Sequence, residues 1–282
     1  KVRIKHDPRY VNPEKCTCCK KCEEVCPVRV PNEFNMGLDQ RPAIYLPFPH
    51  AVPRCYTIDS KNCLYLQKGE CGKCREVCPE GAVQFEEVGM EFEAEVGTII
   101  VATGYDPFDP KLKPELGYGV YKNVITGLEF ERLISPDGPT QGKLQFNGKE
   151  PKNIVFIQCV GSRDKTVNNE YCSRVCCMFT AKQAHLVKDQ IPDARVTICY
   201  IDVRAFGKGY EQFYEAVQKK GIFYRKGIPS EIYQKNGKLI IKADDELLGE
   251  LYQEEADLVV LATGLTQRRD ADRLRNLLKL SL

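Results

Sequence analysis

The stretch CTCCKKCEEVCP, residues 16–27, decides the fold of the first part of the chain. It places Cys16, Cys19, Cys22 and Cys26 at gaps of two, two and three residues and ends in Pro27. This is the spacing of a bacterial four-iron, four-sulfur ligand run, because two-residue gaps curl the backbone and bring successive thiolates together. The proline turns the chain away, and the fourth cysteine of such a run ligates a second cluster.

A second run follows in CLYLQKGECGKCREVCP, residues 63–79, with a first gap of seven residues instead of two. Each predicted cluster therefore takes three cysteines from one run and the last cysteine from the other. One set is Cys16, Cys19, Cys22 and Cys78, and the other is Cys26, Cys63, Cys71 and Cys74. A zinc ribbon also uses paired cysteines, but it explains neither the third close cysteine nor the two Cys-Pro endings.

The composition agrees with metal or redox chemistry. The chain has 282 residues, 15 of them cysteine, with 41 Lys+Arg against 39 Asp+Glu. This length allows about two domains, and the balanced charge predicts no nucleic-acid partner. The apolar stretches are too short for a membrane span, and no secretion signal is present, so we expect a cytoplasmic protein whose cysteines bind metal. Because position 1 is not Met, we expect part of a longer chain or a processed one.

Residues 153–282 have the pattern of an α/β unit. Strands are predicted over 153–160, 195–202 and 222–224, and helices over 173–190 and 210–220. A hairpin is expected over 232–241, with its turn at Asn236-Gly237, and short helices over 128–134 and near the end of the chain.

Two apolar strands, 98–102 and 258–262, lead into Ala-Thr-Gly segments. Small residues at the carboxyl end of a buried strand let a cofactor approach the backbone. The candidate contacts are Ala102, Thr103, Gly104, Ala262, Thr263 and Gly264. The Gly-x-Gly-x-x-Gly turn of dinucleotide-binding units is absent, which disfavours a nicotinamide-dependent enzyme.

Four cysteines, Cys159, Cys172, Cys176 and Cys177, stand where that glycine turn would be. Around the start of one helix they could hold a third cluster, since the helix N-terminus favours thiolate. Buried structural thiols are the alternative, and spacing alone leaves both open. Lys182 shares the apolar stripe of the same helix, where it either reaches the solvent edge or meets a buried anion or cofactor.

These motifs resemble the A subunit of heterodisulfide reductase. The likeness covers nearly the whole chain, including QCVGSRD at 158–164 and YCSRVCCM at 171–178. The resemblance implies an α+β ferredoxin-like domain with two [4Fe–4S] clusters, joined to an α/β, thioredoxin-reductase-like flavoprotein core with two dinucleotide-binding domains. It also implies that Cys159, Cys172, Cys176 and Cys177 hold a third cluster, and that Lys182 lies beside FAD as a catalytic residue.

The domains expected from the resemblance are an inserted dicluster ferredoxin-like domain (1–90), part of an FAD-binding domain with a linker (91–150), a dinucleotide-binding-like domain with the extra cluster (151–256), and a return strand to the FAD domain (257–282). Cys18 and Cys55 are expected to be ordinary small apolar residues, and Cys199 has no assigned role.

The implied function is electron transfer with FAD-based electron bifurcation in a heterodisulfide-reductase-like complex. The implied partners are B- and C-type subunits, a hydrogenase or formate dehydrogenase module, soluble ferredoxin and a second copy of the chain. The alternative is an iron–sulfur wiring or scaffold subunit that binds no flavin.

Overall fold

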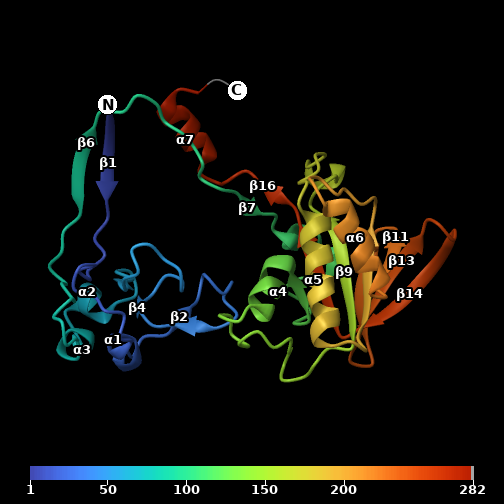
Figure 1. The fold of residues 1–282 in the computed structure, drawn as a ribbon, viewed down its shortest axis with the longest axis horizontal. Helices are drawn as coiled ribbons and strands as arrows, with labels where there is room; N and C mark the ends of the chain where they lie inside the picture. The colour runs from blue at the N-terminus through green and yellow to red at the C-terminus, as the bar shows by residue number, and fades with distance from the viewer. Residues whose placement is uncertain (281–282) are drawn as a thin grey trace. The chain divides into compact units, whose positions relative to one another are not determined.

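The computed structural model describes residues 1–280 and divides into two compact units, traced in Figure 1. Residues 1–101 are called the N-terminal unit here, and residues from 102 onward the C-terminal unit. Within residues 1–280, none of the helices combines the length and the apolar character that crossing a membrane requires.

The N-terminal unit consists of short elements. They are β1 (Val2–His6), α1 (Lys21–Val25), β2 (Val30–Pro31), β3 (Gln40–Arg41), β4 (Ile44–Tyr45), β5 (Thr57–Ile58), α2 (Leu64–Lys68), α3 (Lys73–Glu76) and β6 (Met90–Ala94). Strands β1 and β6 pair antiparallel as a largely exposed arm, and β2–β3 and β4–β5 form two small antiparallel pairs. No strand of this unit is longer than five residues, so regular structure contributes little to its core.

The core of this unit is small. Val11 and Val83 form an isolated antiparallel bridge, and the largest side chains buried beside them are Tyr56 and Phe85. Helices α1 and α3 carry the third cysteine of each run, Cys22 and Cys74. Both side chains pack against the apolar cluster, so the thiols are part of this core.

The C-terminal unit has longer elements. They are β7 (Asp106–Pro107), the 3-10 helices η1 (Pro110–Leu112) and η2 (Pro114–Leu116), β8 (Val124–Thr126), α4 (Gly127–Ile134), β9 (Asn153–Val160), η3 (Lys165–Val167), α5 (Cys176–Gln190), β10 (Arg195–Tyr200), α6 (Tyr210–Lys219), β11 (Phe223–Lys226), β12 (Glu231–Lys235), β13 (Lys238–Asp245), β14 (Glu250–Ala256), β15 (Leu258–Thr263), β16 (Leu265–Thr266) and α7 (Ala271–Leu278).

A five-stranded parallel sheet organises this unit, in the order β11-β10-β9-β15-β8. The path from β9 through α5, β10 and α6 to β11, followed by β15 on the other side of β9, is the strand order of a doubly wound dinucleotide-binding unit. The predicted strand over 153–160 is confirmed to the residue, and the helices predicted over 173–190 and 210–220 are confirmed with shifts of three residues and one residue at one end. Helix α5 begins three residues later than predicted because Arg174 has a left-handed backbone (φ 65°).

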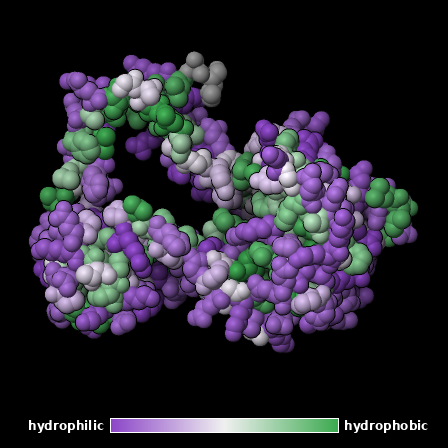
Figure 2. Space-filling view, viewed as in Figure 1, coloured by the Kyte–Doolittle hydropathy of each residue, from purple (hydrophilic) through white to green (hydrophobic). Residues whose placement is uncertain are grey.

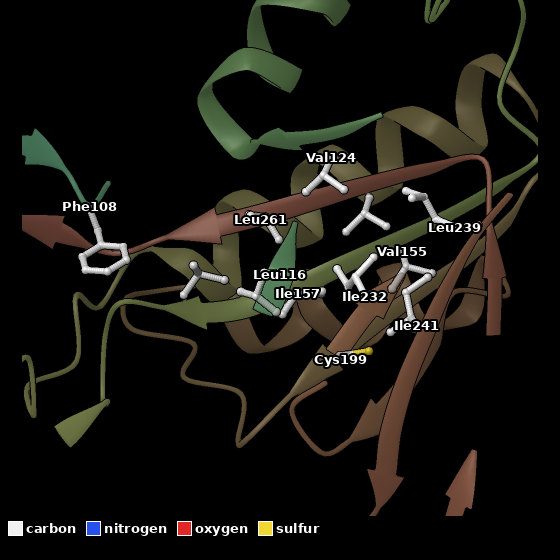
Figure 3. Close-up of a cluster of buried hydrophobic side chains, with 13 residues drawn as sticks. Phe108, Leu116, Val124, Val155, Ile157, Cys199, Ile232, Leu239, Ile241 and Leu261 are labelled. Atoms are coloured by element: carbon white, nitrogen blue, oxygen red, sulfur yellow. The ribbon is translucent and has the colours of Figure 1, made fainter. Parts of the chain in front are cut away.

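The antiparallel sheet β12-β13-β14 packs on one face of the parallel sheet. Figure 3 shows Val155, Ile157 and Leu261 of the parallel sheet facing Leu239 and Ile241 of the antiparallel sheet. The hairpin turn at Asn236-Gly237 forms as predicted, with both residues at positive φ (51° and 79°).

Helix α4 starts at a capping box. The Thr126 hydroxyl accepts the N–H of Glu129, and the Glu129 carboxylate accepts the N–H of Thr126. This cap sets α4 directly after the carboxyl end of β8, so Gly127 and the first turn of the helix stand at that edge of the sheet.

The predicted buried strand over 98–102 is wrong. These residues form no strand, and Ile99, Ile100 and Val101 are 45–86% exposed. A strand must pair its backbone groups, and no described segment pairs with this one. The boundary expected at residue 256 falls between β14 of the antiparallel sheet and β15, which lies in the parallel sheet between β9 and β8.

The surface of the chain is mostly hydrophilic in Figure 2. An exception is the tip of the β13–β14 hairpin, where Leu247, Leu248 and Leu251 are 67–72% exposed. Single exposed apolar residues are normal on a protein surface, and nothing in the described chain shows what would cover these three.

Candidate cofactor sites

The first predicted set of cysteines gathers around one cavity of the N-terminal unit. Cys16, Cys19, Cys22 and Cys78 all line it, and its empty volume, including the open mouth, is about 360 Å³. Lys20 has a left-handed backbone (φ 68°) and curls the chain between Cys19 and Cys22. The four thiols therefore come together from positions up to 62 residues apart in the sequence.

The second predicted set lines a separate cavity. Cys26, Cys63, Cys71 and Cys74 surround about 350 Å³ of empty volume, again including its mouth. Here Gly72 has a φ of 114° and provides the turn between Cys71 and Cys74. The fourth cysteine of each run therefore lines the cavity that the first three cysteines of the other run surround, which is the arrangement that the predicted exchange requires.

Burial and mutual repulsion act on the thiols of both sets. Burial, followed by the neighbouring thiols of Cys74 and Cys16, raises the pKa of Cys22 to about 12. Burial and the thiols of Cys63 and Cys26 raise the pKa of Cys74 to about 12. Thiolates this close together need a cationic centre to offset their charge, and an iron–sulfur core supplies one.

Across residues 1–280, no three or more His, Cys, Asp or Glu side chains converge tightly enough to hold a single metal ion. The thiolates of a cubane each bind a different iron atom, so such a ligand set is wider than the shell of one ion. Four thiols around each of two cavities fit that donor set, and the ligand assignment itself stays a prediction.

The third group of cysteines lies at the carboxyl edge of the parallel sheet. Cys159 is near the end of β9 with a φ of 60°, and Cys176 and Cys177 are the first two residues of α5. Burial, then the thiols of Cys159 and Cys177, raise the pKa of Cys176 to about 12. Sγ of Cys172 accepts the backbone N–H of Arg174 at 3.3 Å.

The start of α5 and two arginines make this edge positive. Helix α5 has no side-chain cap, so its first backbone N–H groups are available to the thiols. Arg163 and Arg204 both pair with the carboxylate of Asp202, at 2.5 and 3.2 Å. Burial, followed by the thiol of Cys177, raises the pKa of Cys159 to about 11, and the charge of Arg163 acts against this rise, toward the thiolate that binds a metal.

Lys182 stands at the rim of a pocket on the same edge of the sheet. The pocket has an empty volume of about 660 Å³, including its mouth, and Phe179, Gln183 and Thr263 also line it. The Lys182 side chain is 52% exposed and forms an ion pair with Glu131 of α4. Lys182 thus reaches the solvent edge and has a carboxylate partner, and its contact with a cofactor stays a prediction.

The two Ala-Thr-Gly segments differ. Ala262 and Thr263 are buried at the end of β15, and a Cβ on Gly264 would come within 2.8 Å of the Ser162 side chain. Ala102, Thr103 and Gly104 are exposed, follow no strand and do not line the Lys182 pocket. The expected symmetry of the two segments is therefore wrong for the described chain, because only the second one ends a paired strand.

Similar proteins were found by comparison, although no family model matches the chain. The A subunit of the "H(2):CoB-CoM heterodisulfide,ferredoxin reductase" of Methanothermobacter marburgensis is 49% identical over 285 residues, which is 100% of this chain and 42% of that protein. The iron-sulfur A subunit of the "CoB--CoM heterodisulfide reductase" of Methanocaldococcus jannaschii is 49% identical over 286 residues, 100% of this chain and 43% of that protein.

This chain belongs to the family of heterodisulfide reductase A subunits. It spans about 42% of the length of these curated relatives. A thioredoxin reductase from T. acidophilum is 20% identical, with 58% of this chain and 42% of that chain covered, at a TM-score of 0.35. That score is too low to support a shared fold.

Three residues of this family member escaped prediction from the sequence. Glu131, the partner of Lys182, lies inside the predicted helix over 128–134, but nothing in the sequence pairs it with α5. Gln183 is 2% exposed and donates to the backbone oxygen of Gly127 at 2.9 Å. Gln158 is 1% exposed next to Cys177, and a glutamine inside an apolar strand was the available signal.

Three cysteines remain. Cys18 lines the first cavity, whereas Cys55 and Cys199 line none of the cavities described above. Cys55 and Cys199 are fully buried in the apolar clusters of the two units, as expected for Cys55. Sγ of Cys199 lies 3.2 Å from the Tyr252 hydroxyl. Cys18 is half-buried, lines the first cavity and donates to the backbone oxygen of Arg54.

Proposed function

We propose that this chain transfers electrons as part of a heterodisulfide-reductase-like iron–sulfur flavoprotein. The observation that carries the proposal is the sorting of eight cysteines into two groups of four around two cavities, as the spacing of the two runs predicts. Two [4Fe–4S] clusters held there, in a ferredoxin-like domain over residues 1–90, would have every iron bound by protein. Such a domain conducts single electrons and leaves no iron open to substrate.

Cys159, Cys172, Cys176 and Cys177 are proposed to hold a third cluster. They stand at the carboxyl ends of parallel strands, where open α/β sheets bind their ligands. Cys177 and Lys182 are five residues apart on α5, or about 7–8 Å along the helix axis. A cluster and a cofactor in the Lys182 pocket would thus be near enough for direct electron exchange.

The Lys182 pocket is proposed as part of an FAD site. FAD, when bound, would supply the exchange between electron pairs and single electrons that bifurcation needs. Lys182 would place a positive charge beside the flavin ring, while Thr263, with Ala262 and Gly264 behind it, would form the wall of the site. Glu131 would hold the lysine in position. Residues 91–150 and 257–282 are proposed to belong to the FAD-binding part, and 151–256 to the domain with the extra cluster.

The partners are proposed from the names of the relatives. The relative from Methanococcus maripaludis is the A subunit of an "H(2)/formate:CoB-CoM heterodisulfide,ferredoxin reductase". By analogy, a hydrogenase or formate dehydrogenase module would supply electrons to a cytoplasmic complex. B- and C-type subunits would reduce a disulfide, soluble ferredoxin would take the low-potential electron, and a second copy of the chain would complete the complex.

Counting cofactors in the anaerobically purified A subunit tests this proposal. Two ferredoxin-type clusters and a third give about twelve iron and twelve acid-labile sulfides per chain, with one FAD. Lys182→Ala should then lower the flavin potentials, since a positive charge stabilises the reduced, more negative ring. Lys220→Ala, which removes an exposed lysine paired with Asp189, is the matched control. Unchanged flavin potentials in the Lys182 variant would refute the proposed role of this lysine in stabilising the reduced flavin.

The alternative is a wiring or scaffold protein without flavin. The exposed Ala102–Gly104 segment favours it, because these three of the seven expected cofactor contacts do not line the Lys182 pocket. About eight iron per chain and no FAD in the intact complex would establish this alternative.

A further inference from the structure

A buried amide lies beside the third group of cysteines. Gln158 of β9 is 1% exposed, and its Oε1 accepts a hydrogen bond from Sγ of Cys177 at 3.5 Å. Its Nε2 is also buried and has no hydrogen-bond partner. Buried donors are almost always paired in native proteins, so this N–H group calls for a partner.

The two ends of a side-chain amide have nearly the same shape, so their partners decide which end faces the sulfur. The protonated thiol of Cys177 is a donor, and it selects the carbonyl oxygen of Gln158. A thiolate that ligates iron carries no proton and can only accept. Oε1 would then face a negative sulfur, and a half-turn of the amide would bring the unpaired N–H to it instead.

The other groups around Cys177 favour the same change. A thiol has one proton, yet Sγ of Cys177 also lies 3.7 Å from the backbone oxygen of Asp202, a second acceptor. The Asp202 carboxylate is paired with Arg163 and Arg204. It therefore does not compete with the Cys177 sulfur for the N–H group of Gln158.

We propose that Gln158 donates an N–H···S hydrogen bond to the iron-bound Cys177 thiolate and thereby raises the reduction potential of the third cluster. The inference rests on the proposed third cluster. Reduction adds negative charge to the cluster and its sulfurs, and a donor stabilises the more negative state. Gln158 is a positioning residue, since it acts through Cys177 and exchanges no electron itself.

The test is a redox titration of the complete complex, followed by electron paramagnetic resonance. The signal of the third cluster is assigned by its loss in Cys177→Ala. In Gln158→Met, which keeps the side-chain length and removes the donor, the midpoint potential of that cluster should become more negative at unchanged iron content. Thr180→Val is the control, because Thr180 is fully buried on α5 and its hydroxyl also has no partner.

An unchanged midpoint in Gln158→Met, or an equal shift in Thr180→Val, overturns the inference. A second measurement needs no variant to fold: with ¹⁵N in glutamine side chains, pulsed resonance of the reduced third cluster should show a weak nitrogen coupling. If this nitrogen coupling is absent, the proposed hydrogen bond from Gln158 to Cys177 is refuted. About eight iron per chain in the wild-type complex refutes the third cluster itself, which separates that failure from the failure of Gln158.

Discussion

The two units of the chain bury different chemistry. The C-terminal unit encloses a cluster of thirteen buried residues between two sheets, and a single cysteine, Cys199, is among them. The N-terminal unit encloses ten, two of them cysteines, and six further cysteines pack against that cluster. The C-terminal unit is stabilised by apolar burial, whereas the N-terminal unit has less of it, so we expect this unit to depend on the clusters proposed for its cysteines.

The N-terminal unit also has a buried polar contact, centred on Arg41. In the N-terminal unit the guanidinium of Arg41 is 7% exposed, donates to Glu33 at 2.6 Å and to Asp59 at 3.1 Å, and stacks on Tyr45. An ion pair of this kind gives specific geometry rather than much stability. It holds the β3–β4 region in place, but it does not replace a larger core.

The largest expected effect is the unfolding of the N-terminal unit while the C-terminal unit stays folded. Removing iron from the anaerobic protein with a chelator should abolish hydrogen-exchange protection in the N-terminal unit, because its cysteines would lose the iron that links them and the apolar core that remains is small. Protection of β9 and β15 in the parallel sheet should persist. Retained protection around the Val11–Val83 bridge in the metal-free protein would contradict the contrast between the units.

A single cysteine should sharpen the contrast. Cys74→Ala, in the second cavity, should remove about four iron per chain, because one cubane loses a ligand. Cys55→Ala is the control: Cys55 is fully buried in the same unit and lines neither cavity, so the iron count should stay unchanged. Iron analysis of the two purified variants decides, and equal iron losses would mean that the cavities are not the metal sites.

In the C-terminal unit, apolar volume should matter most. Phe156 is fully buried in β9 and meets the Phe130 ring edge-to-face at 5.4 Å. Phe156→Ala should lower the free energy of unfolding of this unit by about 3–5 kcal/mol. Leu247→Ala, at a position 68% exposed, should change it by less than about 0.5 kcal/mol. Denaturant unfolding measures the change in the free energy of unfolding for both variants. Similar changes would mean that apolar burial is not the main source of stability of this unit.

The smallest effect concerns pH. Burial opposes ionisation of Asp164, but hydrogen bonds from Thr166 and Lys113 outweigh it and hold its pKa below the usual range. Its contribution is therefore present above the unfolded pKa near 3.8 and is lost as the pH falls through the lower folded pKa. Asp164→Asn should cost less than about 1 kcal/mol at pH 7 and nothing in strong acid. A stability loss that persists at pH 2 would contradict this assignment.

Much of the architecture followed from local patterns. The strand over 153–160 was predicted to the residue because its apolar run has clear ends, and the two cysteine runs indicated which thiols share a cavity. The apolar run 98–102 misled, since composition cannot show whether a strand finds a partner. The Lys182–Glu131 pair and the buried Gln158 amide depend on contacts between distant segments, which no local pattern encodes.

The exchange of the fourth cysteines has a consequence for the unfolded chain. Ligation in the first cavity would tie Cys22 to Cys78, and ligation in the second would tie Cys26 to Cys63, one loop nested inside the other. Loops of about 55 and 35 residues closed in this way would each lower the entropy of the unfolded chain by an amount worth about 4 kcal/mol, on the scale known for disulfides. The two clusters would thus act as cross-links, one inside the loop of the other, in a domain whose apolar core is small.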